Sequence, residues 1–291
     1  MTVEPRDAAT VLLVRDSSTV EAPLGGIGGI EVFMLRRSPR SAFVAGAYVF
    51  PGGAVDPDDR DPSTFALVDG IDDALASRRL GRDHGGLAFW IAAIRETFEE
   101  AGALLARDRA TGDAVSPEIA AGLEHERAPV AAGRRSFAAL ISDHGLVLDG
   151  GSLRLLAHWI TPSPAPRRYD TWFFVAPAPS GHAYAHDDDE TVASEWIGVG
   201  AALERARRGD IDLIYPTFRT LQAIGRFASV AELLEAVDAA SRAPVDAGRP
   251  VSMNGWQLSL PGDGFDDAAQ EADARAHSAT GRPRGPRQVA G

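Results

Sequence analysis

The sequence has 291 residues, 45% of them hydrophobic and 24% charged, with a formal net charge of −12. That is enough apolar material for one large domain or for one domain with appendages, and the negative charge argues against duplex nucleic acid as a partner. The absence of cysteine excludes disulfides, thiolate metal sites and cysteine nucleophiles, while the absence of lysine excludes a lysine nucleophile and a P-loop.

The sequence gives no indication of a signal peptide or of a membrane span. The first residues, MTVEPRD, lack a basic stretch followed by an apolar one, so no signal peptide is expected. No segment approaches the roughly 20 apolar residues of a membrane span. We therefore expect a cytoplasmic protein without a membrane partner.

The first third of the chain predicts a hairpin, a short strand and a long helix. The predicted elements are strands at 9–14, 31–36 and 47–50, a short helix near 71–79 and a long helix at 87–101. The turn-like residues 21–30 contain Gly-Gly-Ile-Gly-Gly, but no helix follows this run as a phosphate loop requires. Gly102 is well placed to end the long helix.

The rest of the chain mixes both kinds of element. We expect helices at 136–144, 201–208 and 217–240, the last broken near 225–229, and strands at 155–160, 171–175, 192–197 and 251–260. An irregular mixture that begins with a hairpin indicates α/β layers rather than regular βαβ winding. Beyond residue 262 the chain is polar and rich in Gly, Pro and Arg, which predicts disorder.

The long helix carries three glutamates on one face. Glu96, Glu99 and Glu100 have i, i+3 and i+4 spacing, and Arg95 alone cannot balance them. A solvated acidic face is the simplest explanation for an arbitrary helix. Here the opposite face is strongly apolar, and Pro51-Gly52-Gly53 at the end of a strand allows a ligand to approach closely. A divalent cation such as Mg²⁺ or Mn²⁺ would compensate the charge, with a backbone carbonyl of the glycine turn as a further ligand.

These residues resemble the signature of the Nudix hydrolases, which is Gly, five residues, Glu, seven residues, then Arg-Glu-apolar-x-Glu-Glu-x-Gly-apolar. Gly53 fits the first glycine, and residues 95–103 fit the second half. The resemblance implies an α/β/α sandwich with a mixed sheet in residues 1–200. A helical extension packed on the core would follow in 201–260, and a disordered tail in 261–291.

The signature departs from the family pattern in its middle. Asp59 stands where the family has Glu, and Arg95 follows it by 36 positions rather than eight, so about 28 residues are inserted. Leu87, eight positions before Arg95, cannot replace the Glu. Asp59, Asp58 or Asp83 could hold Arg95 instead, or no residue takes over this role. We expect the inserted residues, about 60–86, to form a surface excursion, because added loop length has a modest entropic cost.

The insertion is similar to that of the Nudix branch that hydrolyses coenzyme A and its thioesters. Three further segments share this similarity: residues 35–40, 46–53 and 159–174. The resemblance implies hydrolysis of a pyrophosphate bond in coenzyme A or an acyl-CoA, giving 3′,5′-ADP and phosphopantetheine or its acyl form.

Three other functions remain open. ADP-ribose, NADH or another dinucleotide is an alternative substrate. A non-catalytic Nudix-fold ligand-binding module is another possibility, although all three glutamates are retained. An interaction domain whose acidic helix faces water is the third, and a metal titration followed by thermal melting would separate it.

The resemblance also implies roles for single residues. Gly53, Glu96, Glu99 and Glu100 would hold Mg²⁺ or Mn²⁺, and Arg95 with Asp59 would support the motif. The general base would be Glu96, Glu99 or an acid of the loop 186–190, of which Glu190 is our choice over a merely polar turn. Arg36, Arg37, Arg40 and Arg168 would bind phosphates, or form a solvated basic edge. The partner is then a small nucleotide, and a homodimer is compatible with this interpretation.

Overall fold

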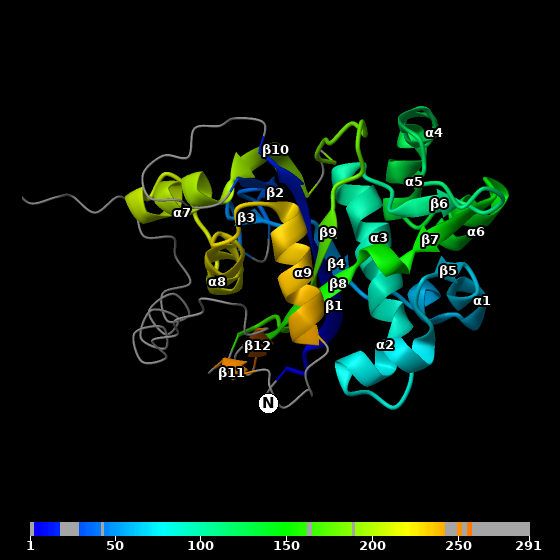
Figure 1. The fold of residues 1–291 in the computed structure, drawn as a ribbon, viewed down its shortest axis with the longest axis horizontal. Helices are drawn as coiled ribbons and strands as arrows, with labels where there is room; N and C mark the ends of the chain where they lie inside the picture. The colour runs from blue at the N-terminus through cyan, green and yellow to red at the C-terminus, as the bar shows by residue number, and fades with distance from the viewer. Residues whose placement is uncertain are drawn as a thin grey trace, which may run out of the picture.

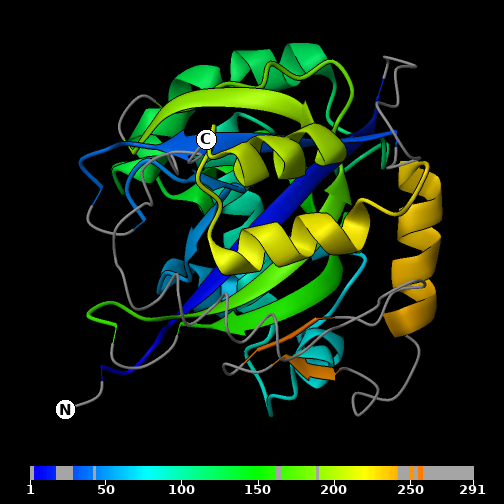
Figure 2. The ribbon, with the colours of Figure 1, turned by 90° about the vertical axis from the view of Figure 1, so that its left-hand side faces the viewer.

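A mixed sheet lies between two layers of helices. The computed structural model describes residues 3–17, 29–41, 44–161, 165–187 and 190–241, and the backbone of 249–251 and 255–257. Helix α3 (Leu87–Ala101) covers one face of the sheet, and α7 (Val199–Arg208), α8 (Tyr215–Ile224) and α9 (Val230–Ser241) cover the other (Figures 1 and 2). The expected α/β/α sandwich is confirmed. None of the helices in this part of the chain is long and apolar enough to cross a membrane.

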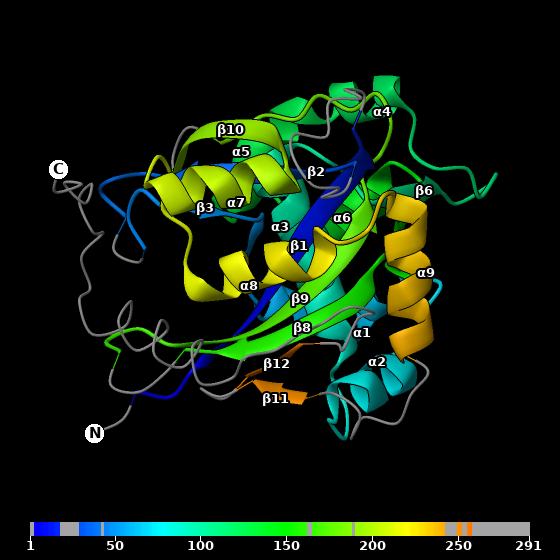
Figure 3. The same ribbon diagram turned by 60° about the vertical axis from the view of Figure 1, so that its left-hand side comes forward.

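The main sheet is built around the longest strand, β1. Its order is β10 (Thr191–Gly198), β2 (Ile30–Arg37), β1 (Arg6–Asp16), β9 (Tyr169–Pro177), β8 (Arg154–Ile160), β12 (Gly255–Gln257) and β11 (Arg249–Val251). The β1–β9 pair is parallel, and the other neighbours are antiparallel. Two short strands extend this frame: β3 (Tyr48–Val49) pairs with β2, and β4 (Gly52–Ala54) pairs with β1. Figure 3 shows β12 and β11 continuing the sheet beyond β8.

The central strands are apolar on both faces because helices cover both. Val11 and Leu13 of β1 pack toward α3, whereas Leu12 and Val14 belong to the core under α7, α8 and α9. Strand residues point alternately to the two faces, so a continuous apolar run marks a strand buried on both sides. This pattern fixes the register and leaves α3 flat against β1 and β4.

Most of the predicted elements are present in the structure. The hairpin of β1 and β2, the helix at 87–101 and the break between α8 and α9 are confirmed. The strand predicted at 251–260 is instead two short strands, β11 and β12. The turn-like residues 21–28 and the tail at 261–291 lie outside the described residues.

A second sheet of three short strands lies beside α3. Its order is β5 (Val68–Asp69), β7 (Leu146–Asp149) and β6 (Ala106–Asp108). The remaining short helices of this side are α4 (Pro117–Gly122), η2 (Glu124–Glu126), α5 (Arg127–Ala131), α6 (Phe137–Asp143) and η3 (Gly150–Ser152). Of these, α4, α5 and α6 contribute Ala120, Val130, Phe137, Leu140 and Ile141 to the apolar core around α3.

The inserted residues are more than a surface excursion, and in this respect the sequence-based expectation was wrong. They form the end of η1 (Asp58–Arg60), α1 (Pro62–Phe65), β5 and α2 (Asp73–Leu80). Strand β5 pairs in parallel with β7, and Ala76 and Leu80 are buried in the core around α3. Amphipathic helical spacing within the insertion explains this, because α2 can bury one face only by packing on its neighbour.

The insertion also caps the helix that follows it. The Leu87 N–H donates to Asp73 Oδ1 (2.9 Å), the Gly85 N–H donates to Asp73 Oδ2 (3.0 Å), and the Gly86 N–H donates to Ser77 Oγ (2.9 Å). The first N–H groups of a helix have no partner within the helix and need such acceptors. Residues of α2 therefore supply what a capping side chain of α3 itself would supply.

Both ends of the insertion are tied to Asp7 at the start of β1. Arg60 Nη2 donates to Asp7 Oδ2 (2.5 Å), and Arg82 Nη2 donates to Asp7 Oδ1 (2.8 Å). Arg82 also lies over the ring of Phe89 in α3, 4.6 Å from its centroid. The Asp7 carboxylate thus holds both ends of the inserted segment, through Arg60 and Arg82, against the first strand of the sheet.

We predict that Asp7→Asn weakens this closure. Loss of the charge should lower the free energy of unfolding by about 1–3 kcal/mol, the range for hydrogen bonds to a charged group. Asp210→Asn is the matched control, since its ion pair with Arg208 is more than half exposed and should contribute about 1 kcal/mol or less. Urea unfolding of both variants measures the difference. Equal effects would show that Asp7 does not hold the insertion.

Candidate active site

The core fixes the direction of α3 and therefore of its glutamates. Trp90 packs edge-on against Phe174 of β9 with ring centroids 4.7 Å apart, and Phe98 lies 5.9 Å from Phe137. Nearly every residue of α3 is buried, including Glu99 and Glu100, which are 9% and 7% exposed. The helix cannot rotate without exposing these rings, so its acidic residues face β4 and η1.

The glycines of β4 let the backbone approach those acids. A Cβ atom built on Gly53 would lie 2.5 Å from Glu96 Oε1, so any side chain at this position would collide with the carboxylate. Gly52 has φ of 157°, and its N–H donates to Glu100 Oε2 at 2.8 Å. Glycine at 53 leaves room for the Glu96 carboxylate, whereas glycine at 52 is needed because a Cβ atom there would lie 2.4 Å from the Ala9 carbonyl oxygen of β1.

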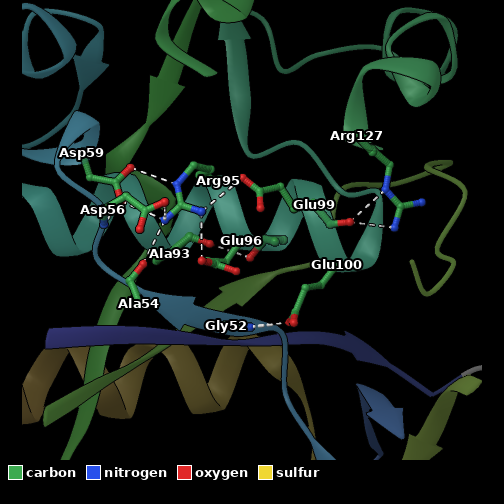
Figure 4. Close-up of polar contacts among 11 residues, drawn as sticks. Gly52, Ala54, Asp56, Asp59, Ala93, Arg95, Glu96, Glu99, Glu100 and Arg127 are labelled. Atoms are coloured by element: carbon green, nitrogen blue, oxygen red, sulfur yellow. Dashed lines mark hydrogen bonds and ion pairs between the residues drawn. The ribbon is translucent and has the colours of Figure 1, made fainter. Parts of the chain in front are cut away.

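Arg95 joins the two halves of the motif (Figure 4). Its Nε and Nη2 atoms donate to the two oxygens of Asp59, at 3.0 and 2.8 Å. Nη1 donates to Glu96 Oε1 (2.9 Å) and Glu99 Oε1 (3.1 Å), and Nη2 also donates to the Ala54 carbonyl (2.9 Å). Asp59 is 2% exposed, so the insertion of about 28 residues leaves this acid directly opposite Arg95.

Of the three acids that the sequence allowed as the partner of Arg95, the structure selects one. Asp59 forms the two hydrogen bonds, whereas Asp58 and Asp83 are exposed and do not contact Arg95. Burial opposes the charge of Arg95. Hydrogen bonding to Asp59 and the charges of Glu96 and Glu99 outweigh this and raise the pKa of Arg95 above its ordinary value, so it remains a cation.

The glutamates carry more negative charge than Arg95 can balance. Burial raises the pKa of Glu96 to about 7, although the charge of Arg95 acts in the opposite direction. Burial likewise raises the pKa of Glu99, and it raises that of Glu100 well above the ordinary value, with Glu96 adding to the effect. Asp56 (3.7 Å), Asp59, Glu96 and Glu99 all lie within ion-pair distance of the Arg95 guanidinium. Glu100 adds a further buried carboxylate that has no ion pair with Arg95, so the arrangement lacks positive charge.

The donor chemistry of this cluster fits a hard divalent cation. Carboxylate oxygens and a backbone carbonyl are the ligands that Mg²⁺ and Mn²⁺ prefer. Among the described residues, no three acidic or histidine side chains converge on one point. The hydrogen bonds explain this, because Arg95 occupies an oxygen of Glu96 and of Glu99 while Glu100 turns to the Gly52 N–H.

The predicted arginines lie in different surroundings. Arg37 is on the α3 side of β2: it pairs with Glu190 (3.3 Å), and within the described residues its buried Nε has no hydrogen-bond partner. Strand alternation places Arg36, which is exposed, on the opposite face. Arg40 is exposed in the following turn. Arg168 donates to the carbonyls of Thr161 and Val3, both at 2.8 Å. Only Arg37 is thus placed near the glutamates.

The loop at 186–190 contributes a residue that the sequence did not single out. Glu190 has a side chain that is 65% exposed and is paired with Arg37. Asp187 accepts hydrogen bonds from Glu190 N (3.0 Å), Thr191 N (3.1 Å) and Thr191 Oγ1 (3.2 Å). The charge of Asp187 adds to the raised pKa of Glu100, whose main cause is burial, so these two carboxylates lie within electrostatic reach.

A sandwich with a glutamate helix over a Gly-Gly turn defines a Nudix hydrolase. A family model described as the NUDT19 Nudix domain matches residues 73–224, and the chain belongs to this family. A NUDIX hydrolase from Alicyclobacillus acidocaldarius of known structure is similar, with a TM-score of 0.62 and 28% identity. That alignment covers 84% of this chain and 100% of the other.

Two curated relatives carry the name acyl-coenzyme A diphosphatase NUDT19. The Homo sapiens protein is 31% identical over an alignment of 236 residues, and this alignment covers 70% of this chain and 63% of that protein. The Gallus gallus protein is 30% identical over 298 residues, covering 89% of this chain and 79% of the relative. The alignment with the human protein thus spans less than two thirds of its length.

The raised pKa values predict how stability depends on pH in the presence of a chelator. Folded Glu96, Glu99 and Glu100 hold protons more tightly than their unfolded counterparts, whose pKa is near 4.5. Their contribution is therefore fully favourable below that value and is lost as pH rises toward about 7. Between pH 5 and 8, the free energy of unfolding of the metal-free protein should decline.

Urea unfolding at several pH values, with and without Mg²⁺, measures this. Burial lowers the pKa of His182, which gives the opposite trend below pH 6.5, so the informative quantity is the slope relative to Glu100→Gln. That variant should show a shallower decline, and Mg²⁺ should stabilise the unmodified protein most at high pH. Identical slopes in the two proteins would contradict the buried-charge interpretation.

Proposed function

We propose that this chain hydrolyses the pyrophosphate bond of coenzyme A or an acyl-CoA, giving 3′,5′-ADP and phosphopantetheine or its acyl form. The observation that carries the proposal is the intact set of glutamates on α3, in a chain about 30% identical to proteins named acyl-CoA diphosphatase. A silent ligand-binding module would have no need for so much buried, unbalanced negative charge. The proposal includes a small-molecule nucleotide substrate and action in the cytoplasm.

The proposed ligands of Mg²⁺ or Mn²⁺ are Gly53 through its carbonyl, and Glu96, Glu99 and Glu100 through their carboxylates. When bound, the cation supplies positive charge against the pyrophosphate and lowers the pKa of a coordinated water. Arg95 and Asp59 keep the glutamates of α3 in register with β4. The protein side of the reaction is therefore a rigid set of oxygens on a buried helix.

A carboxylate must accept the proton of the attacking water. Glu96 and Glu99 are candidates within the cluster, and Glu190 is the candidate that the sequence favours in the loop. Glu190 is paired with Arg37, whereas the charge of Asp187 acts on Glu100, so we add Asp187 to the candidate bases. Asp187→Asn and Glu190→Gln are the pair of variants that separates the two loop acids.

The phosphates of the substrate need positive charge from the chain as well. Arg37 is the best placed, because it faces the glutamates and its buried Nε is unpaired among the described residues. Arg36, Arg40 and Arg168 remain part of the proposal as further phosphate contacts, and we assign the 3′-phosphate of the substrate to Arg36, Arg37 and Arg168. Arginine binds phosphate through paired charge-assisted hydrogen bonds, so loss of one contact should cost about 1.5–3 kcal/mol.

The first prediction for the reaction concerns the glutamates. Glu99→Gln and Glu100→Gln should each keep the fold and lower kcat by roughly a hundredfold or more, equal to about 3 kcal/mol of transition-state stabilisation. Glu118→Gln, at an exposed position of α4, is the matched control and should retain full activity. Rates with excess Mg²⁺ and with excess chelator provide the measurement, and full activity in chelator would exclude the metal mechanism.

The second prediction concerns the substrate. Under one Mg²⁺ concentration, CoA and short acyl-CoA should be cut faster than dephospho-CoA, ADP-ribose or NADH, because only the former carry the 3′-phosphate. Arg37→Gln should reduce this preference more than Arg207→Gln, which changes an exposed arginine of α7. Chromatography of the released products gives the rates. Equal rates for CoA, dephospho-CoA and ADP-ribose would leave only a general pyrophosphohydrolase.

A further inference from the structure

Arg127 is a buried arginine outside the Nudix motif. It begins the short helix α5, and it is 7% exposed. Its Nε and Nη2 atoms donate to the Glu99 carbonyl at 3.2 and 3.0 Å, and Nη2 also donates to the Ala185 carbonyl at 2.8 Å. Nη1 pairs with Glu124 at 2.6 Å. Every nitrogen of this guanidinium is therefore engaged, and two of them bind the backbone of the glutamate helix (Figure 4).

The end of α3 needs these bonds. The last carbonyls of a helix have no partner within the helix. The Gly102 N–H donates a hydrogen bond to the Phe98 carbonyl at 3.0 Å, and the Ala185 N–H donates one to the Ala101 carbonyl at 3.3 Å. Arg127 binds the Glu99 carbonyl, and its positive charge also suits a helix C-terminus.

Residue 185 is thus held to α3 twice, once by its own N–H and once through Arg127. Gly102 has φ of 69°, which favours glycine, and a Cβ atom there would lie 3.0 Å from the Ala183 carbonyl oxygen and 3.2 Å from Arg127 Nη1, so glycine keeps this packing free of crowding. The chain continues for two residues to Asp187, whose carboxylate accepts hydrogen bonds from the N–H and the hydroxyl of Thr191. The negative charge of Asp187 acts on Glu100.

We propose that Arg127 is a positioning residue that holds the C-terminal end of α3 and the segment 185–187 in one register, so that Asp187 faces Glu100. The inference rests on the proposed function. In that function Arg127 touches neither substrate nor metal and acts through two backbone carbonyls. Of the hydrogen bonds described for residues 182–187, those to α3 run through Ala185 and Arg127, whereas His186 and Asp187 bind Ser194 and Thr191 of β10. Loss of Arg127 should therefore loosen the loop acid relative to α3 while β10 still holds it.

A double-mutant cycle tests the proposal. Arg127→Gln and Asp187→Asn are made singly and together, and kcat and KM are measured with the best substrate. Asparagine keeps an oxygen that can accept the hydrogen bonds that Glu190 and Thr191 donate to Asp187. Each single variant should lower kcat on the order of tenfold with KM changed less, and the double variant should lose no more than Asp187→Asn alone, because groups that act as a unit are not additive.

Two further variants separate positioning from stability. Glu124→Gln removes the ion pair and leaves both carbonyl bonds of Arg127, so it should keep the rate of the unmodified protein. Arg127→Lys keeps the charge and one carbonyl contact, so it should fall between Arg127→Gln and the unmodified protein. It also keeps the test available if Arg127→Gln does not fold, which circular dichroism would show.

The affinity for Mn²⁺, measured by electron paramagnetic resonance, is the readout that does not depend on activity. Asp187→Asn removes a charge near Glu100 and should weaken Mn²⁺ binding several-fold. Arg127→Gln should weaken it to a similar extent, and the double variant should bind Mn²⁺ no more weakly than Asp187→Asn alone. If the unmodified chain cuts none of the nucleotides while the Mn²⁺ affinities of the cycle are non-additive, the proposed function fails and the positioning role of Arg127 stands. Effects on kcat and Mn²⁺ affinity that multiply in the double variant would overturn the role of Arg127.

Discussion

The rest of the structure depends on negative charge that is buried around one guanidinium. Arg95 binds Asp59, Glu96 and Glu99, while Glu100 is held by the backbone of Gly52. Burial of these acids is unfavourable unless positive charge compensates it, and Arg95 compensates only part. A folded chain that maintains such an arrangement needs strong apolar packing behind it. The rings on the opposite side of α3, Trp90 and Phe98 among them, provide that packing.

The insertion preserves this arrangement although it divides the motif. Asp59 precedes it and remains against Arg95, and Asp73 within it accepts a hydrogen bond from the first N–H of α3, that of Leu87. Asp7 of β1 then ties both of its ends to the sheet. The added residues therefore act as a support for the glutamate helix, and a domain of this family can lengthen its motif without moving the acids.

The sequence predicted the sandwich and α3 well, because periodic apolar residues and Gly102 define that helix locally. It allowed three partners for Arg95, since only tertiary folding of the insertion brings residue 59 beside residue 95. In the loop it favoured Glu190, because a run of neighbouring acids without periodicity gives no means of ranking them. The hydrogen bonds from Glu190 N and Thr191 N that place Asp187 are not visible in a sequence. Arg127 carries no motif spacing, and its contacts are to backbone atoms, so no sequence signal could have indicated it.

A single structural measurement tests most directly whether the charge deficit of α3 is a cation site. Crystals of the unmodified chain soaked in Mn²⁺ should show an anomalous difference peak between the Gly53 carbonyl and the carboxylates of Glu96, Glu99 and Glu100, with Arg95 still bound to Asp59. The same soak of Glu100→Gln should give a much weaker peak. If strong manganese peaks lie only elsewhere on the molecule while Arg95 keeps its hydrogen bonds to Glu96 and Glu99, the glutamates are not the metal ligands and the account fails.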